Sequence, residues 1–377
     1  MMQNEPIRVL QINSGSRNFG GVSSFLYNVY THIDREKVQF DFLSPNITTY
    51  GIHKDEIENL GGKIFELGIT GNIIAKKVKL YFRLKKFLKD NPYKIVHINS
   101  GNFFFNLFAA KAVRAAGVKT CIVHSHNAGD TSHSKLKKTA FQILKPSLEK
   151  KADYLFACSV KAAEYMFTED TVKNQKVSII RNGIDIKRFV YDAGRRQKVR
   201  SELGLEDKII VGHIGRFLAQ KNHEFLIKVF SEIYKKEKNA VLLLFGTGEL
   251  EEIIRKMVAE LGLNDAVRFM GTVSNIEDMY QAMDVFVMPS FHEGLPVTCI
   301  ELQVNGVPCV LSDTITTEVK FNDNVVFLPL DCGEAKWRDT ALSLCDGGHE
   351  MNLAALEKAG YRIDDVVNDL TQRYINI

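Results

Sequence analysis

Residues 285–313 read VFVMPSFHEGLPVTCIELQVNGVPCVLSD and hold a complete strand–loop–helix–strand unit. The run VFVMPS is apolar enough for a strand buried on both faces, SFHEG is its exit loop, and PCVLSD is a second buried strand. Between the two runs, Pro296 suits the first turn of a helix, and Gly306 fits just past the end of that helix. Two buried strands joined by a helix predict a parallel sheet.

The same alternation of apolar runs and helical segments extends over the whole chain. In the first half the predicted strands are residues 7–14, 38–44, 63–68, 94–100, 119–126, 153–159 and 176–182. In the second half they are residues 208–215, 240–246, 267–271, 285–290, 308–313 and 325–330. Two such series in 377 residues predict an α/β protein with two doubly wound parallel sheets, one in each domain. The seam is expected near residues 181–197, where polar residues interrupt the pattern.

The composition is that of a soluble globular protein, with 45% hydrophobic and 25% charged residues. The first residues lack the apolar core of a signal peptide, and no stretch reaches the ~18 apolar residues of a membrane span. The six cysteines form no C-x-x-C pair, and most stand in apolar runs. These features predict a cytoplasmic protein with reduced core thiols and argue against a metal site.

The net charge of +4 hides an asymmetry between the two halves. Residues 1–187 carry 28 Lys and Arg against 16 Asp and Glu, whereas residues 188–377 carry 21 against 29. Much of the basic excess lies in residues 73–93 and 133–154, where lysines alternate with apolar side chains. Such segments form either amphipathic helices with a solvated basic face or a contact with anionic lipid headgroups. Nucleic acid is disfavoured, because the second half is acidic and contains no recognised nucleic-acid module.

Ligands of open parallel sheets bind beyond the carboxyl ends of the strands, so unusual residues at those ends are candidates. Gly20 and Gly21 follow the first strand, where they form either a tight turn or a close approach to an anionic ligand. His124 and His126 follow another strand in HSHN, as satisfied loop histidines or as groups that orient a sugar hydroxyl. The chain has neither the G-x-G-x-x-G dinucleotide fingerprint nor a Walker P-loop.

The second half has its own candidates. Arg216 follows a strand, and Lys221 comes just before a helix, so the two cations suit a diphosphate. Glu293 lies in the exit loop of the opening unit, and Glu301 lies about one turn into its helix. The spacing of the two glutamates alone is weak evidence, because three other glutamate pairs share it.

The surroundings of the Glu293–Glu301 pair are stronger evidence than the spacing. A nucleoside diphosphate sugar presents ribose, diphosphate and sugar in the same order in which Glu301, the helix start and Glu293 are expected to stand. Glu301 could accept from the ribose hydroxyls, amides near Gly294 and Leu295 could hold phosphate, and Glu293 could address the sugar.

These residues, in this order, resemble glycosyltransferase family 4, the retaining enzymes of the GT-B fold, and most of all its capsular and exopolysaccharide subgroup. The resemblance covers essentially the whole chain. It is carried by the Gly-Gly-Val loop, HSHN, RNGID, GRFLAQKNHEFLI, GTGELEE, the EGLP helix with both glutamates, and SDTIT. It implies two Rossmann-like domains facing an interdomain cleft. Residues 1–187 would bind the acceptor, residues 188–355 the nucleotide sugar, and residues 356–377 would form a helix that crosses back.

The resemblance also implies roles for single residues. The implied catalytic residues are His126, Arg216, Lys221 and Glu293. The implied nucleotide-sugar-binding residues are Gly20, Gly21, Arg216, Lys221, Val273, Glu293, Gly294, Leu295 and Glu301. Val273 belongs to the segment 271–273 whose backbone would meet uracil. One departure is Leu302, where the family often has alanine after the second glutamate; this concerns helix packing more than ligand contact.

The implied reaction is transfer of a hexosyl-type sugar from a UDP-sugar to a saccharide acceptor, with retention of anomeric configuration. No cofactor is implied. The chain lacks an Asp-x-Asp triplet, in agreement with stabilisation of the leaving group by Arg and Lys instead of a metal. The acceptor is expected to be lipid-linked, and the enzyme to lie at the inner face of the cell membrane. GDP- or ADP-sugar donors, a sugar-nucleotide epimerase and a non-catalytic sugar-nucleotide-binding subunit remain alternatives.

Overall fold

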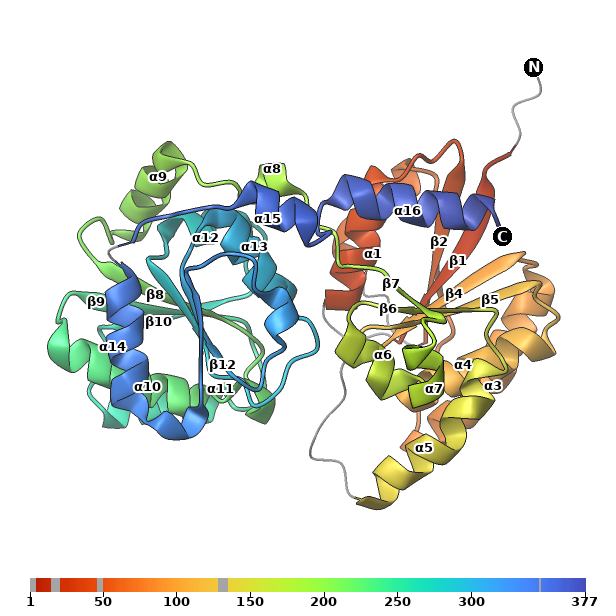
Figure 1. The fold of residues 1–377 in the computed structure, drawn as a ribbon, viewed down its shortest axis with the longest axis horizontal. Coiled ribbons are helices and arrows are strands. Elements are labelled where there is room, and N and C mark those ends of the chain that lie inside the picture. Colours follow the sequence, from red (N-terminus) through yellow and green to blue (C-terminus); the bar gives the residue numbers. More distant parts are fainter. Residues whose placement is uncertain (1–4, 15–20, 46–49, 128–134, 346) are drawn as a thin grey trace. The chain divides into compact units, whose positions relative to one another are not determined.

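The computed structural model describes residues 5–14, 21–45, 50–127, 135–345 and 347–377. It divides into two compact units, each built on one sheet (Figure 1). Unit 1 consists of residues 1–184 and 360–377, and unit 2 consists of residues 185–359. All strand pairs in both sheets are parallel, so the predicted fold class is confirmed.

Unit 1 has a seven-stranded sheet in the order β3-β2-β1-β4-β5-β6-β7. Its strands are β1 (Ile7–Asn13), β2 (Val38–Ser44), β3 (Ile64–Glu66), β4 (Ile95–Ser100), β5 (Thr120–Ser125), β6 (Tyr154–Ala157) and β7 (Val177–Ile179). The central strands β2, β4 and β5 are buried at every position, as expected for strands covered by helices on both faces.

The helices of unit 1 follow its strands along the chain. They are α1 (Gly21–His32), α2 (Lys54–Asn59), α3 (Ile73–Asp90), α4 (Phe103–Ala115), α5 (Lys135–Glu149), α6 (Val160–Met166) and α7 (Glu169–Lys173). The last helix of the chain, α16 (Ile363–Ile375), also belongs to this unit and packs on α1. It places Leu370 and Tyr374 in the same apolar core as Val29 of α1 and Phe40 of β2.

Unit 2 has a six-stranded sheet in the order β10-β9-β8-β11-β12-β13. Its strands are β8 (Ile209–Ile214), β9 (Ala240–Phe245), β10 (Val267–Gly271), β11 (Val285–Met288), β12 (Cys309–Ser312) and β13 (Val325–Leu328). Its helices are α8 (Ile186–Phe189), α9 (Ala193–Leu203), α10 (His223–Lys236), α11 (Glu251–Glu260), α12 (Ile276–Ala282), α13 (Val297–Asn305), α14 (Glu334–Cys345) and α15 (Leu353–Lys358). Each of the thirteen predicted strand segments contains one observed strand.

The quoted stretch at residues 285–313 forms β11, α13 and β12, as predicted. Gly306 ends α13 with a φ of 84°, a left-handed conformation that glycine adopts without steric cost. Pro296 stands one position before the helix, with a ψ of 99°, and not in its first turn. The fixed φ of proline still suits the entry to a helix, so the observed helix begins only one residue later than predicted.

Within the described ranges, no helix is long and apolar enough to cross a membrane. The most apolar candidate in the sequence, α4, spans only 13 residues and carries Lys111 and Arg114.

Candidate functional site

The topology of unit 2 marks the edge formed by the carboxyl ends of its strands as the place for a ligand. From β8 the chain winds through β9 to β10, the outermost strand on that side, and it then returns to pair β11 with the other side of β8. Ligands of open parallel sheets bind where the winding direction changes, beyond the carboxyl ends of the two strands. Arg216 follows β8 and Glu293 follows β11, so both leave the sheet at this switch point.

Lys221 and Glu293 form an ion pair at this edge. Nζ of Lys221 lies 2.8 Å from Oε1 of Glu293, and the two side chains are only 18% and 10% exposed. Gln220 supports the loop after β11 by donating from Nε2 to the main-chain oxygen of His292 at 2.8 Å. A Cβ on Gly215 would lie 2.9 Å from the Lys221 side chain, so the glycine makes room for the lysine stem. The lysine is thus held in place before any ligand arrives, and its ammonium has further protons to offer to phosphate oxygens.

Arg216 stands in contrast, because its side chain is exposed and makes no hydrogen bond or ion pair within the described part of the chain. The backbone around it is closely packed. Gly246, which follows β9, has a φ of 126°, and a Cβ there would lie 2.3 Å from the main-chain oxygen of Gly215. Two neighbouring strand-exit loops therefore hold the backbone at Arg216 firmly, while its guanidinium remains available to an anion.

Glu301 is paired with a tyrosine that the sequence did not suggest. The Tyr280 hydroxyl, on α12, donates to Oε2 of Glu301 at 2.6 Å. Burial raises the pKa of the Glu301 carboxyl, and the hydrogen bond from Tyr280 and the positive charge of Arg188 act in the opposite direction. No hydrogen bond or ion pair in the described part of unit 2 joins Glu301 to Glu293. The second oxygen, Oε1, makes no hydrogen bond with the described residues and can therefore accept from a ligand hydroxyl.

The N-terminus of α13 lies between the two glutamates in sequence. The amides of Gly294 and Leu295 donate no hydrogen bond to any described residue, and the helix start carries no side-chain cap. Unsatisfied amides at a helix start favour an anion such as phosphate. Val273 lies just beyond β10 and is partly exposed.

In unit 1, His126 directly follows β5 and is partly buried. Its Nε2 lies 3.1 Å from Oδ1 of Asn99, and its ring lies 4.0 Å from that of His124. Burial lowers the pKa of His126 to about 3, so the imidazole is neutral at pH 7. Gly21 is the first residue of α1, with open space where a Cβ would stand. Gly20 lies outside the described residues.

Family models match both halves of the chain. One described as Glycosyltransferase Family 4 matches residues 19–188, and one described as Glycosyl transferases group 1 matches residues 195–328. EpsF of Bacillus subtilis (strain 168), provisionally named a glycosyltransferase, is 30% identical over an alignment of 380 positions that covers 99% of this chain and 97% of that protein. The chain belongs to glycosyltransferase family 4. This family assignment supports a transferase activity.

This glycosyltransferase is also similar to a second relative in sequence and to a solved structure in fold. The UDP-Gal:alpha-D-GlcNAc-diphosphoundecaprenol alpha-1,3-galactosyltransferase of Escherichia coli is 28% identical over 246 residues, which are 64% of this chain and 63% of that protein. Anabaena HepE, solved in complex with UDP-glucose, matches the structure with a TM-score of 0.74 at 15% identity, over 98% of this chain and 100% of that chain. At this identity the structural match shows the fold alone, which is the GT-B architecture.

Sequence reasoning missed several polar residues of the transferase. Gln11, His97, Asn99 and Tyr374 are buried and hydrogen-bonded to one another in unit 1. A signal for three of them existed, because polar residues alternate with apolar ones in β1 (IRVLQIN) and β4 (IVHINS). Tyr280 and Tyr374 lie on helices, where no such alternation marks them.

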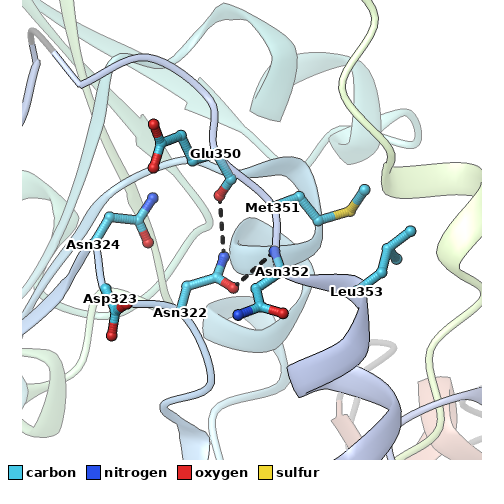
Figure 2. Close-up of a pocket in the computed structure, with 7 residues that line it drawn as sticks. All are labelled: Asn322, Asp323, Asn324, Glu350, Met351, Asn352 and Leu353. Atoms are coloured by element: carbon cyan, nitrogen blue, oxygen red, sulfur yellow. Dashed lines mark hydrogen bonds between the residues drawn. The ribbon is translucent and has the colours of Figure 1, made fainter.

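A pocket of about 320 Å³ lies elsewhere on unit 2 and contains none of the predicted site residues. Figure 2 shows its lining residues, which are Asn322, Asp323, Asn324, Glu350, Met351, Asn352 and Leu353. Asn322 donates to the main-chain oxygen of Glu350 and accepts from the amide of Asn352. It also donates to the main-chain oxygen of Gln303, at the end of α13. The polar groups of Asn322 are thus used to anchor this segment of chain.

Helix α3 carries two apolar stripes. Leu80, Leu84 and Leu88 are buried, whereas Ile74, Val78 and Phe82 are 76%, 47% and 62% exposed. At about 100° per residue, Val78 stands about 200° from Leu80, so the exposed stripe faces away from the core. The same helix carries seven cationic side chains, and three of them, Lys76, Lys85 and Lys89, make no side-chain hydrogen bond, ion pair or cation–π contact within the described ranges. Figure 1 shows α3 beside α4, on which it packs.

Proposed function

We propose that this protein is a retaining glycosyltransferase that moves a hexosyl-type sugar from a UDP-sugar to a lipid-linked saccharide, in capsular, exopolysaccharide or O-antigen synthesis. One observation carries the proposal. The Lys221–Glu293 ion pair stands at the carboxyl ends of β8 and β11 in unit 2, and Glu301 lies on the helix that follows. The Arg216 guanidinium and the amides just before α13 have no hydrogen-bond partner among the described residues. These are groups that a ribose, a diphosphate and a sugar require.

Each group has a proposed task. Arg216 and Lys221 bind the diphosphate, together with the amides of Gly294 and Leu295. Glu301 accepts from the ribose hydroxyls through the oxygen that Tyr280 does not use. Glu293 accepts from hydroxyls of the donor sugar, and its ion pair with Lys221 orders both side chains before binding. In unit 1, His126 addresses the reacting sugar, and Gly21 with Gly20 lets the backbone approach the ligand.

The chemical step breaks the bond between the anomeric carbon and the diphosphate oxygen. Negative charge grows on the leaving phosphate, and Arg216 and Lys221 stabilise it. The acceptor hydroxyl attacks from the same face, and the leaving phosphate takes its proton, so the anomeric configuration is retained. Because the two cations supply the charge stabilisation, we expect neither a cofactor nor a divalent metal to be required. Transfer should therefore continue in EDTA, and loss of transfer that Mg²⁺ restores would refute this point.

Support for the donor and acceptor classes comes from the similar proteins. The Escherichia coli relative is named for UDP-Gal and a diphosphoundecaprenol-linked acceptor, and HepE was solved with UDP-glucose. A lipid-linked acceptor resides at a membrane. The exposed apolar stripe of α3 and the lysines Lys76, Lys85 and Lys89 on the same helix are suited to an anionic bilayer surface. We therefore propose peripheral association with the inner face of the cell membrane.

The donor proposal is tested by thermal melting of the full-length protein with UDP, GDP, ADP and their sugars, followed by transfer assays with the stabilising donor. A ligand that binds only the native state raises the melting temperature with occupancy. We expect UDP and one UDP-sugar to stabilise the protein, and a lipid-linked saccharide to receive that sugar with retained configuration. Epimerised donor without an acceptor would instead identify an epimerase. Binding without turnover on any acceptor would identify a non-catalytic subunit.

The membrane proposal is tested by sedimentation with vesicles of phosphatidylglycerol and phosphatidylcholine. Burying a phenylalanine side chain in the bilayer should stabilise the bound state by about 1.5–3 kcal/mol. Phe82→Asp should therefore weaken vesicle binding about tenfold or more. Replacing Lys76, Lys85 and Lys89 with glutamine should weaken it further at low salt, by about 1 kcal/mol for each lysine. Ile253→Asp is the matched control, because Ile253 is 54% exposed on α11 of unit 2. Equal binding of all variants, or no binding by the wild type, would refute α3 as the docking surface.

A further inference from the structure

A chain of buried hydrogen bonds in unit 1 connects the C-terminal helix with His126. The Tyr374 hydroxyl on α16 accepts from Nε2 of Gln11 at 3.1 Å and lies 2.6 Å from Nδ1 of His97. Oε1 of Gln11 accepts from Nδ2 of Asn99 at 2.9 Å, and Oδ1 of Asn99 lies 3.1 Å from Nε2 of His126. Tyr374, Gln11, His97 and Asn99 are each at most 1% exposed, so none of them exchanges its partner for bulk water.

The backbone of β4 sets the direction of this chain. Nδ2 of Asn99 lies 3.1 Å from the main-chain oxygen of His97, which can only accept. The amide nitrogen of Asn99 is therefore on that side, and its oxygen faces His126. Because an amide oxygen can only accept as well, Nε2 of His126 must carry the hydrogen.

A neutral imidazole protonated at Nε2 has a lone pair at Nδ1. Burial keeps the ring neutral at pH 7 by lowering the pKa of His126 to about 3. Nδ1 makes no hydrogen bond within the described part of unit 1. A hydroxyl of a bound sugar can therefore donate to it, whereas the other tautomer would present an N–H at the same place.

We propose that Asn99 is a positioning residue, which holds His126 in its Nε2-protonated form so that Nδ1 accepts from a hydroxyl of the transferred sugar. Gln11 and Tyr374 keep the Asn99 amide in its orientation, so the last helix of the chain contributes to the order of the site. This inference rests on the proposed function, since it takes a sugar as the ligand of His126.

The first test is nuclear magnetic resonance of the full-length chain labelled with ¹⁵N-histidine, with His126→Gln used to assign the ring signals. The wild type should show His126 protonated at Nε2 alone. Asn99→Leu should lose this single tautomer, and Tyr374→Phe should change the same signals to a smaller extent. Thr371→Val is the matched control, because the Thr371 hydroxyl is also buried on α16 but bonds only to the main-chain oxygen of Val367, outside the network.

The second test separates positioning from folding and from donor binding. Asn99→Leu should lower kcat/KM for the UDP-sugar about 10- to 100-fold, while the Kd of UDP, which lacks the transferred sugar, changes less than about twofold. A wild-type ring protonated at Nδ1 would overturn the proposal on the protein alone, whatever its activity. A tautomer that survives Asn99→Leu, or a tautomer change with unaltered kcat/KM, would also overturn it. Failure of the wild type to bind any nucleotide sugar would instead remove the proposed function, while the spectra would still report the tautomer.

Discussion

The ribose contact of Glu301 can be tested by combining a protein variant with a modified ligand. Oε2 accepts from Tyr280, which leaves Oε1 for the 2′- and 3′-hydroxyls of UDP. A hydrogen bond to a charged group is worth about 1.5–3 kcal/mol, so even one such bond to a ribose hydroxyl stabilises the complex by that amount. Glu301→Ala should therefore raise the Kd of UDP by at least about 10- to 150-fold. Isothermal titration calorimetry measures this directly.

The same titrations with 2′,3′-dideoxy-UDP decide whether the loss comes from ribose. This ligand has no hydroxyl to offer, so Glu301→Ala should change its Kd by no more than about threefold. Glu260→Ala is the control variant, because Glu260 is exposed at the end of α11 and belongs to a glutamate pair with the same eight-residue spacing. Equal losses for UDP and its dideoxy analogue would show that Glu301 does not contact ribose.

Four further predictions follow from charges, burial and backbone geometry. Arg216→Ala should lower kcat about 100-fold or more at unchanged melting temperature, and a near-normal rate would refute its phosphate role. Lys221→Met leaves the Glu293 carboxylate buried without its cation, so it should destabilise the ligand-free protein by about 3 kcal/mol in urea unfolding, whereas Lys221→Met with Glu293→Gln should recover most of this loss. Glu301→Gln should raise the melting temperature of the ligand-free protein at pH 7.5 but not at pH 4, because an acid whose pKa is raised on folding loses stability as the pH rises through that raised value. Six histidines have lowered pKa values, namely the buried His97, His124, His213 and His223 and the partly buried His126 and His349. The native state therefore lacks protons that the unfolded chain binds below pH ~6.5, so stability should be complete above that pH and fall below it by about 1.4 kcal/mol per pH unit for each histidine. A flat profile of unfolding free energy from pH 7 to 5 would contradict this.

The fold and the positions of the candidate residues could be read from local patterns. A strand covered on both faces must be apolar at nearly every position, so β8, β9, β11 and β12 stand out in the chain. Glycine and proline at the ends of α13 mark a helix because their backbone preferences are local. Once the strands are known, Arg216 and Glu293 must lie at one edge of a parallel sheet, since all its carboxyl ends meet there.

The partners of these residues depended on the tertiary structure. Nothing near Lys221 in sequence indicates that its ammonium pairs with Glu293, 72 positions away, while Arg216 has no such partner in the part of the chain that the structure describes. Likewise, Tyr374 meets Gln11 across 363 positions because α16 returns to unit 1. A side chain's intrinsic chemistry is set by its own residue, so the sequence by itself determined which groups were candidates and on which strand ends they stand. Hydrogen bonds and ion pairs act over only a few ångströms, and only the folded chain decides which groups come that close.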